Sequence, residues 1–187
     1  MPAEFLKKYF ADMQRIFQAF SVEEFAKFIS ELKDAYEKGL SIFVFGNGGS
    51  GLNASHFASD LNKEASLGKP KRFKVTCLND SPALISSYAN DISYADIFSE
   101  QLKNFMKEKD LVIGISGSGN SENVIRAIDY ANEEGARTLG ICGFKGGRLK
   151  KVALNCLVID SDDMQKVEDA HLIILHCAVQ WLKLNLP

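Results

Sequence analysis

Two loops rich in glycine and serine each follow a short apolar run and precede a helical pattern. The first loop is 46–50, after the run 42–45, and the second is 116–121, after the run 111–115. Strands that are apolar throughout and alternate with helices are typical of a parallel sheet covered by helices on both faces. The chain is therefore expected to be an α/β protein.

The same patterns predict a three-layer, doubly wound sheet of the flavodoxin-like type, preceded by two extra helices. The expected strands are 41–46, 73–78, 111–116, 137–142 and 156–160. The expected helices are 3–20, 21–38, 50–65, a short one from 81, 94–107, 121–134 and 164–184. Ligands of such sheets bind beyond the carboxyl ends of the strands, near the switch in strand order. Both glycine loops lie at such ends.

The first 39 residues are expected to form a helical segment, ahead of a sheet unit with a final helix over 40–187. Together they are predicted to be one domain, 1–187. Ser21 and Glu24 have the spacing of a capping box, and Gly39 is the expected end of the second helix. The phenylalanines of this segment fit two interpretations, the domain's own core or a subunit interface. They are residues 5, 10, 17, 20, 25 and 28.

Composition and charge argue against a nucleic-acid-binding, membrane or secreted protein. The chain has 187 residues, enough for a large core, and its net charge of −2 gives no electrostatic case for nucleic acid or an acidic membrane. No apolar stretch reaches membrane-spanning length, and no secretory leader is expected. Its four cysteines form no CxxC pair, so reduced thiols and a cytoplasmic location are expected.

The glycine loops suit a phosphorylated small molecule. Glycine lets the backbone approach a ligand closely, and a helix N-terminus offers free N–H groups with a partial positive charge. Serine hydroxyls add further donors. We therefore expect a phosphate group to bind where the two loops meet.

All three histidines fall in two predicted helices. His56 and Asp60 share one helix face, where they could hold a metal or a substrate, or only form a surface hydrogen bond. Glu168, His171 and His176 lie in the last helix, where both histidines could also be ordinary helix residues. Glu168 and His176 are eight residues apart, roughly 12 Å on a straight helix. A shared ion would need a bent helix or side chains from two subunits.

The combination of GNGGS, HFASD, ISGSGNSENV and the late helical Glu and His resembles the phosphoheptose isomerases of the sugar isomerase (SIS) domain superfamily. The resemblance extends over nearly the whole chain, including the two N-terminal helices. It implies an aldose–ketose isomerase acting on sedoheptulose 7-phosphate, in a homotetramer with sites between subunits. An enediol mechanism is implied, in which Asp60 is the candidate base and His176 the candidate acid.

The resemblance also implies binding roles. One Zn²⁺ per subunit would bind to His56, Asp60, Glu168 and His176. Phosphate would bind to Ser50, Ser116, Ser118 and Ser121, with Gly117 in the same loop. The sugar site would be lined by Asn47, Gly48, Gly49, Asn90 and Asp91, with Glu168 also at the substrate.

Two positions depart from the family pattern. Asp60 stands where the family usually has Glu, and Glu168 where it usually has Gln. Two histidines and two carboxylates suit Zn²⁺, so the metal interpretation stands. These departures leave two alternatives open: a non-catalytic phosphosugar-binding or scaffold protein resembling the DnaA initiator-associating protein, or an isomerase of another phosphosugar.

Overall fold

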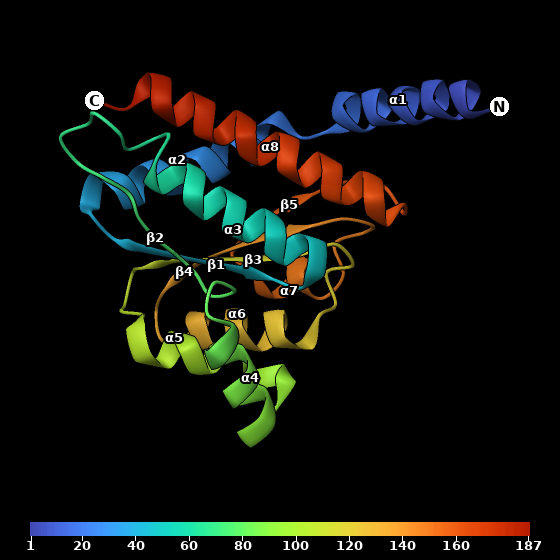
Figure 1. Ribbon diagram of the computed structural model, residues 1–187. Coiled ribbons are helices and arrows are strands. Elements are labelled where there is room, and N and C mark those ends of the chain that lie inside the picture. Colours follow the sequence, from blue (N-terminus) through green and yellow to red (C-terminus); the bar gives the residue numbers. More distant parts are fainter.

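The protein is a three-layer α/β structure in a computed structural model that describes all 187 residues (Figure 1). Its five strands pair in the order β2-β1-β3-β4-β5, and every pair is parallel. The strands are β1 Ser41–Gly46, β2 Lys74–Cys77, β3 Leu111–Ser116, β4 Arg137–Cys142 and β5 Asn155–Val158. This confirms the predicted doubly wound sheet, whose strand order reverses between β1 and β3.

Helices cover both faces of the sheet. The chain forms α1 Pro2–Ala19, α2 Val22–Lys38, α3 Gly48–Asn62, α4 Pro82–Asp91, the 3-10 helix η1 Tyr94–Asp96, α5 Ser99–Phe105, α6 Glu122–Glu133, α7 Leu149–Val152 and α8 Met164–Asn185. Helices α2, α3 and α8 lie on one face, and α4, α5 and α6 on the other (Figure 1). Helix α1 contacts α8 and extends beyond the layers.

Successive side chains of each strand point to opposite faces of the sheet, so a hydrophobic core forms on each face. Ile42 and Val44 face the core under α2, α3 and α8, whereas Phe43 and Phe45 face the core under α5 and α6. All four are at most 3% exposed. Burial of such a side chain contributes about 1.5–3 kcal/mol, so the central strands are held from both faces. The loops that follow them are thus attached to a rigid base.

In the N-terminal segment, the second helix begins and ends at the residues that the sequence predicted. The Ser21 side chain accepts a hydrogen bond from the Glu24 amide at 3.1 Å, and Gly39 ends α2 with a φ of 67°. Its phenylalanines differ in burial. Phe28 is buried in the core, whereas Phe5 and Phe10 on α1 are 71% and 63% exposed.

Two details of the predicted elements are wrong. The single helix expected over 94–107 is broken into η1 and α5, because the fully buried Ile97 and Phe98 insert between them toward the sheet. Helix α7 was not expected, since its four residues are too few to show a periodic pattern. Neither difference changes the strand order or the place of the glycine loops.

Candidate functional site

The first glycine loop connects β1 to α3. Gly48 adopts a φ of 52°, a left-handed conformation that glycine allows without strain. The Asn79 side chain holds the loop's first residue on both sides, accepting from the Gly46 amide at 3.2 Å and donating to its carbonyl at 2.8 Å. Asn47 is the N-cap of α3, yet its side chain makes no capping bond. The first N–H groups of α3 are therefore open to a ligand.

The second loop connects β3 to α6, and it also ends at a helix N-cap whose side chain makes no capping bond. Ser121 is the N-cap of α6 and makes no side-chain capping bond; instead Ser116 and Ser121 hydroxyls lie 3.1 Å apart. Gly119 has a φ of 66° and packs against the backbone of Gly146. Two helices thus begin side by side without a side-chain cap, which is the arrangement that binds anions.

The two loops enclose a hollow of about 250 Å³. It is lined by Asn47, Gly48, Gly49, Ser50, Ser116, Gly117, Ser118, Ser121, Met164 and Glu168. The predicted phosphate-binding residues are therefore brought together by the fold. No lysine or arginine is among the lining residues, so an anion there would be held by N–H groups and hydroxyls.

Glu168 brings the one charged side chain into this hollow. A Cβ placed on Gly49 would lie 2.5 Å from the Glu168 carboxyl oxygens, so the absence of a side chain at position 49 makes room for them. The Asn53 side chain donates to the Glu168 carbonyl at 3.0 Å, which links α3 to the first turns of α8. The carboxylate is thus placed to accept hydrogen bonds from a bound ligand.

Asn90 and Asp91, predicted at the sugar site, do not line the hollow. Both lie exposed at the end of α4, and the Asn90 side chain donates to the Asp91 carboxylate at 2.7 Å. The segment that follows does reach the first loop, because the Tyr94 hydroxyl lies 3.1 Å from Asn47 Oδ1.

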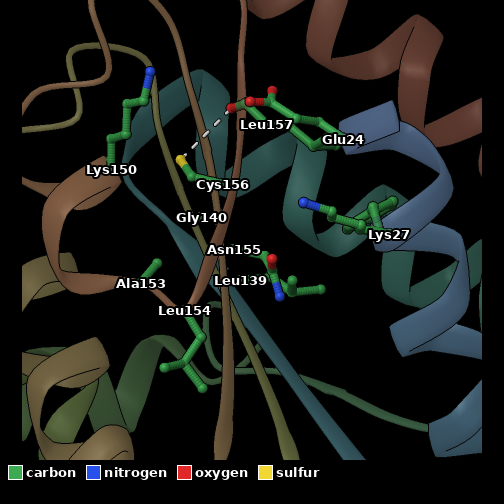
Figure 2. Close-up of a pocket in the computed structure, with 11 residues that line it drawn as sticks. Glu24, Lys27, Leu139, Gly140, Lys150, Ala153, Leu154, Asn155, Cys156 and Leu157 are labelled. Atoms are coloured by element: carbon green, nitrogen blue, oxygen red, sulfur yellow. Dashed lines mark hydrogen bonds between the residues drawn. The ribbon is translucent and has the colours of Figure 1, made fainter. Parts of the chain in front are cut away.

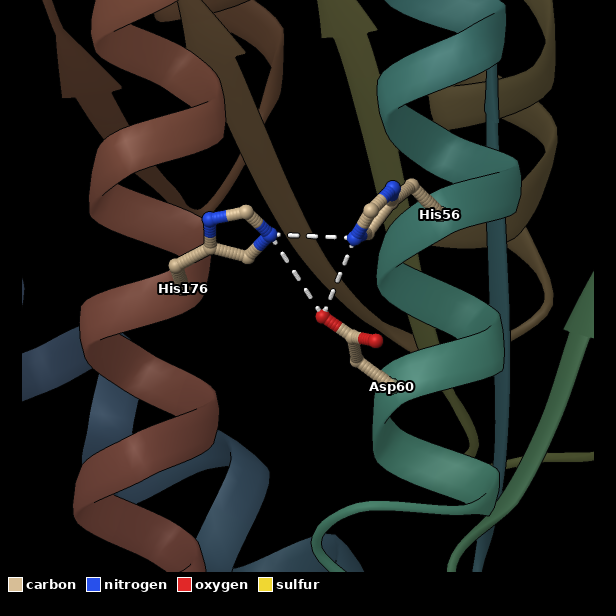
Figure 3. Close-up of side chains that lie close together, drawn as sticks. All are labelled: His56, Asp60 and His176. Carbon is tan, nitrogen blue, oxygen red and sulfur yellow. Dashed lines mark hydrogen bonds and ion pairs between the residues drawn. The ribbon is translucent and has the colours of Figure 1, made fainter.

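A second group of polar side chains lies between α3 and α8. Figure 3 shows His56 and Asp60 on one face of α3, opposite His176 on α8. The His56 and His176 Nε2 atoms are 3.0 Å apart, and Asp60 Oδ2 lies 3.3 Å from His56 and 3.6 Å from His176. The shared helix face expected for His56 and Asp60 is therefore present.

These three side chains fit a zinc ion. Zinc ligands at about 2.0–2.1 Å in tetrahedral geometry are roughly 3.3 Å from one another, and the three measured separations bracket that value. Two imidazoles and a carboxylate are also a common zinc donor set. Three protein ligands leave a fourth position for water or substrate, as in catalytic sites.

Glu168 is not part of this group, whose members are His56, Asp60 and His176. Helix α8 is continuous from Met164 to Asn185, and the carboxylate of Glu168 enters the hollow instead. Within one chain, three of the four predicted zinc ligands meet and the fourth lies with the phosphate loops.

His171 is a core residue. It is fully buried, and neither ring nitrogen has a hydrogen-bond partner. Burial is the larger cause and lowers its pKa from 6.5 to about 4, against the opposite effect of the Cys142 backbone. This imidazole is therefore neutral at neutral pH, and its burial keeps it out of reach of a ligand in solution.

A separate cavity of about 170 Å³ lies at the outer edge of the sheet, beside β5 (Figure 2). Cys156 faces it, with Cys142 Sγ at 3.2 Å. The hydrogen bond between the Cys156 and Cys142 thiols, together with burial, raises the pKa of the Cys156 thiol far above its usual range, so it stays protonated and is a poor nucleophile. This cavity does not belong to the glycine-loop site.

Sequence reasoning missed two residues that organise the first loop, Asn79 and Asn123. Asn123 hydrogen bonds with Asn47 across the two loops, at 2.8 and 2.9 Å. Asn123 lies two residues after Ser121, but its burial and its partner Asn47 show only in the structure, so no signal in the sequence could have found it. Among the helices of the chain, none is long and apolar enough to cross a membrane.

Comparisons with known proteins show the family of this chain. The family model described as the SIS domain matches residues 8–143. A probable phosphoheptose isomerase of Thermoplasma acidophilum is 35% identical over 175 residues, which are 92% of this chain and 96% of that protein. Phosphoheptose isomerase 1 of Campylobacter jejuni is 34% identical over 177 residues, which are 94% and 95% of the two chains.

Solved structures share the fold. The structure of a phosphoheptose isomerase from Francisella tularensis superposes with a TM-score of 0.91, and the match covers 99% of this chain and 100% of that one at 24% identity. A phosphoheptose isomerase from Neisseria gonorrhoeae superposes with a TM-score of 0.89 over 97% and 98% of the two chains, at 23% identity. At these identities the similarity shows the architecture, including both helices before the sheet.

Proposed function

We propose that this chain, which belongs to the phosphoheptose isomerase family of SIS domain proteins, converts sedoheptulose 7-phosphate to D-glycero-D-manno-heptose 7-phosphate. Its relatives at 34–35% identity over more than nine-tenths of the chain are named phosphoheptose isomerases, so it is an enzyme and a phosphosugar isomerase. The heptulose substrate is the finer step that we propose here.

One observation carries the phosphosugar assignment. Two helices without side-chain caps begin at one hollow, and four serines line it: Ser50, Ser116, Ser118 and Ser121. Free N–H groups, helix dipoles and hydroxyls are all donors suited to a phosphate dianion. Binding at the phosphate fixes the position of the distant carbonyl, which contributes to the rate by orientation.

Isomerisation requires a base and an acid. In our proposal Asp60 removes a proton from the carbon beside the carbonyl, which gives an enediol, and returns it to the neighbouring carbon. His176 moves a proton between the two oxygens through Nδ1, the ring nitrogen that does not face His56 and Asp60. Glu168 in the hollow accepts hydrogen bonds from sugar hydroxyls, and Asn90 and Asp91 complete the sugar site.

We further propose one zinc ion per subunit, held by His56, Asp60 and His176, whose mutual distances suit it. When bound, the ion would polarise the sugar carbonyl and stabilise negative charge on its oxygen. Glu168 remains the proposed fourth ligand only through a partner subunit, because within one chain it lies in the hollow.

The proposed assembly is a homotetramer with sites shared between subunits. Helix α1 supports it, since α1 extends beyond the layers and exposes Phe5, Leu6 and Phe10. Contiguous exposed apolar side chains mark interaction surfaces. The proposed location is the cytoplasm, which accords with four free cysteines.

Turnover of sedoheptulose 7-phosphate, followed by separation of ketose and aldose phosphates, tests the function. We expect the double variant Ser118→Ala, Ser121→Ala to raise KM strongly, since each hydrogen bond lost to a charged group costs roughly 1.5–3 kcal/mol. The matched control is Ser86→Ala, Ser87→Ala on α4, where both hydroxyls bond only to their own helix. Unchanged kinetics in a folded Ser118, Ser121 variant would exclude this loop as the phosphate site.

Asp60→Asn separates catalysis from binding. We expect it to abolish turnover while sedoheptulose 7-phosphate still binds in calorimetry, and we expect Glu64→Gln, one turn further along the chain, to stay active. Full activity of Asp60→Asn would place the base elsewhere. Binding without turnover in the unmodified protein would favour the non-catalytic alternative, and turnover of a different ketose phosphate would change the substrate.

A further inference from the structure

The side chains of Asn47 and Asn123 pair face to face across the two glycine loops. Asn47 Nδ2 donates to Asn123 Oδ1 at 2.8 Å, and Asn123 Nδ2 donates to Asn47 Oδ1 at 2.9 Å. Asn123 is only 2% exposed and does not line the hollow, whereas Asn47 does. The pair therefore joins a buried residue of α6 to a residue of the ligand-binding loop.

A backbone amide fixes the orientation of both side chains. The Val124 N–H, which can only donate, lies 3.0 Å from Asn123 Oδ1. That atom must then be the oxygen, so the Asn47 atom facing it must be the nitrogen. The Asn47 oxygen consequently faces both Asn123 Nδ2 and the Tyr94 hydroxyl, which donates to it at 3.1 Å. Reversal of either amide would place like groups against each other.

Counting hydrogens then shows what Asn47 can offer a ligand. Its oxygen already accepts two hydrogen bonds, and one of its two N–H groups donates to Asn123. The second N–H has no partner within the chain, and Asn47 lines the hollow. The pairing also replaces the N-capping bond that asparagine usually makes, which leaves the first N–H groups of α3 free.

We propose that Asn123 and Tyr94 are positioning residues, which hold the Asn47 amide so that its remaining N–H donates to an oxygen of the phosphosugar. This inference rests on the proposed function and deepens it. Asn123 acts only through Asn47, and Tyr94 adds a second hydrogen bond to the same oxygen from outside the sheet. Without them, the Asn47 side chain can rotate to cap α3 and withdraw its donor.

A double-mutant cycle, measured with sedoheptulose 7-phosphate as the ligand, tests whether Asn123 acts through Asn47. Asn47→Ala and Asn123→Ala should each raise the KM, and the Kd in calorimetry, by up to about tenfold, the effect of losing one hydrogen bond to the ligand. In the Asn47→Ala background, Asn123→Ala should change neither value further. Tyr94→Phe should have a smaller effect, because Asn123 still holds the amide.

The control is Asn132→Ala on the same helix. Asn132 has a comparable set of bonds, to the Val152 carbonyl and the Thr138 hydroxyl, but lies away from the hollow. The Asn132→Ala variant should have a lower melting temperature but an unchanged KM. A merely structural role of Asn123 would give the same result as this control. The variant Asn123→Asp keeps the acceptor for Val124 and Asn47 but places its second oxygen against Asn47 Oδ1, so it should raise the KM as Asn123→Ala does.

The outcomes distinguish a failure of the positioning role from a failure of the proposed function. If Asn123→Ala weakens binding equally with and without Asn47, or leaves KM unchanged, the positioning role is overturned while the function stands. If Asn47→Ala itself leaves binding unchanged, Asn47 does not contact the ligand and the inference also fails. If the unmodified protein neither binds nor turns over sedoheptulose 7-phosphate, the proposed function fails first.

Discussion

Replacing the buried His171 by leucine should change how stability depends on pH. In the unfolded chain this imidazole titrates near 6.5, whereas burial lowers its pKa to about 4 in the folded protein. Between these values the unfolded chain binds a proton that the folded chain does not, so the free energy of unfolding falls as pH falls. Leucine has a similar size and no proton to bind.

The size of the effect follows from the two pKa values. Relative to neutral pH, His171 should destabilise the protein by about 2 kcal/mol near pH 5, and by roughly 3 kcal/mol below about pH 4. The His171→Leu protein should lack this loss. Urea unfolding of both proteins across this range, at one protein concentration, gives the difference between them. Groups common to both proteins, including the other histidines, cancel in that difference.

The test depends on how the difference in unfolding free energy changes with pH, because its value at neutral pH also includes changes in packing. Removing two buried nitrogens without partners stabilises by about 1–3 kcal/mol, whereas a changed side-chain shape costs up to roughly 1.5 kcal/mol. A difference that stays constant from about pH 7 to pH 4 would show that His171 titrates alike in both states, and would refute the burial argument. His171→Met provides a second variant without a titrating group.

Three further outcomes are expected. Gly119→Ala should destabilise the protein and abolish phosphosugar binding, since Gly119 has a φ of 66° and a Cβ there would overlap the Gly146 carbonyl; wild-type melting and affinity would contradict this. Tyr9→Phe should speed hydrogen exchange in α1, because it removes a 2.6 Å bond to Asp169 on α8, and unchanged exchange would show that other contacts hold α1. Chelation should lower both activity and the melting temperature if zinc is bound, because a ligand of the folded state stabilises it.

The fold could be predicted because its signals are local. Apolar strands such as β1 and β3 appear as continuous runs, and Ser21 and Gly39 mark the ends of α2 by capping chemistry that needs only a few neighbouring residues. Helix α7 and the break before α5 gave no such signal. The first is too short for a period, and the second depends on burial of Ile97, a tertiary effect.

The site was only partly predictable for a similar reason. Strand ends at one sheet edge bring the serines together, and an i, i+4 spacing puts His56 beside Asp60, so both follow from sequence. The separation of Glu168 from His176 also follows from helix geometry, whereas which of the two meets His56 depends on how α8 packs against α3. The partnership of Asn47 with Asn123 spans 76 positions, a distance over which single-sequence patterns carry no information.

The lack of cationic side chains around the glycine-loop hollow has a consequence for how ionic strength acts on the enzyme. Binding of a phosphate to lysine or arginine weakens as salt screens the charges, whereas short contacts with N–H dipoles and hydroxyls in a partly enclosed site are screened far less. Affinity should therefore depend on the shape and hydrogen-bond geometry of the anion more than on its charge. Such a hollow captures its ligand slowly, without long-range attraction, and selects tetrahedral oxyanions over other anions of equal charge.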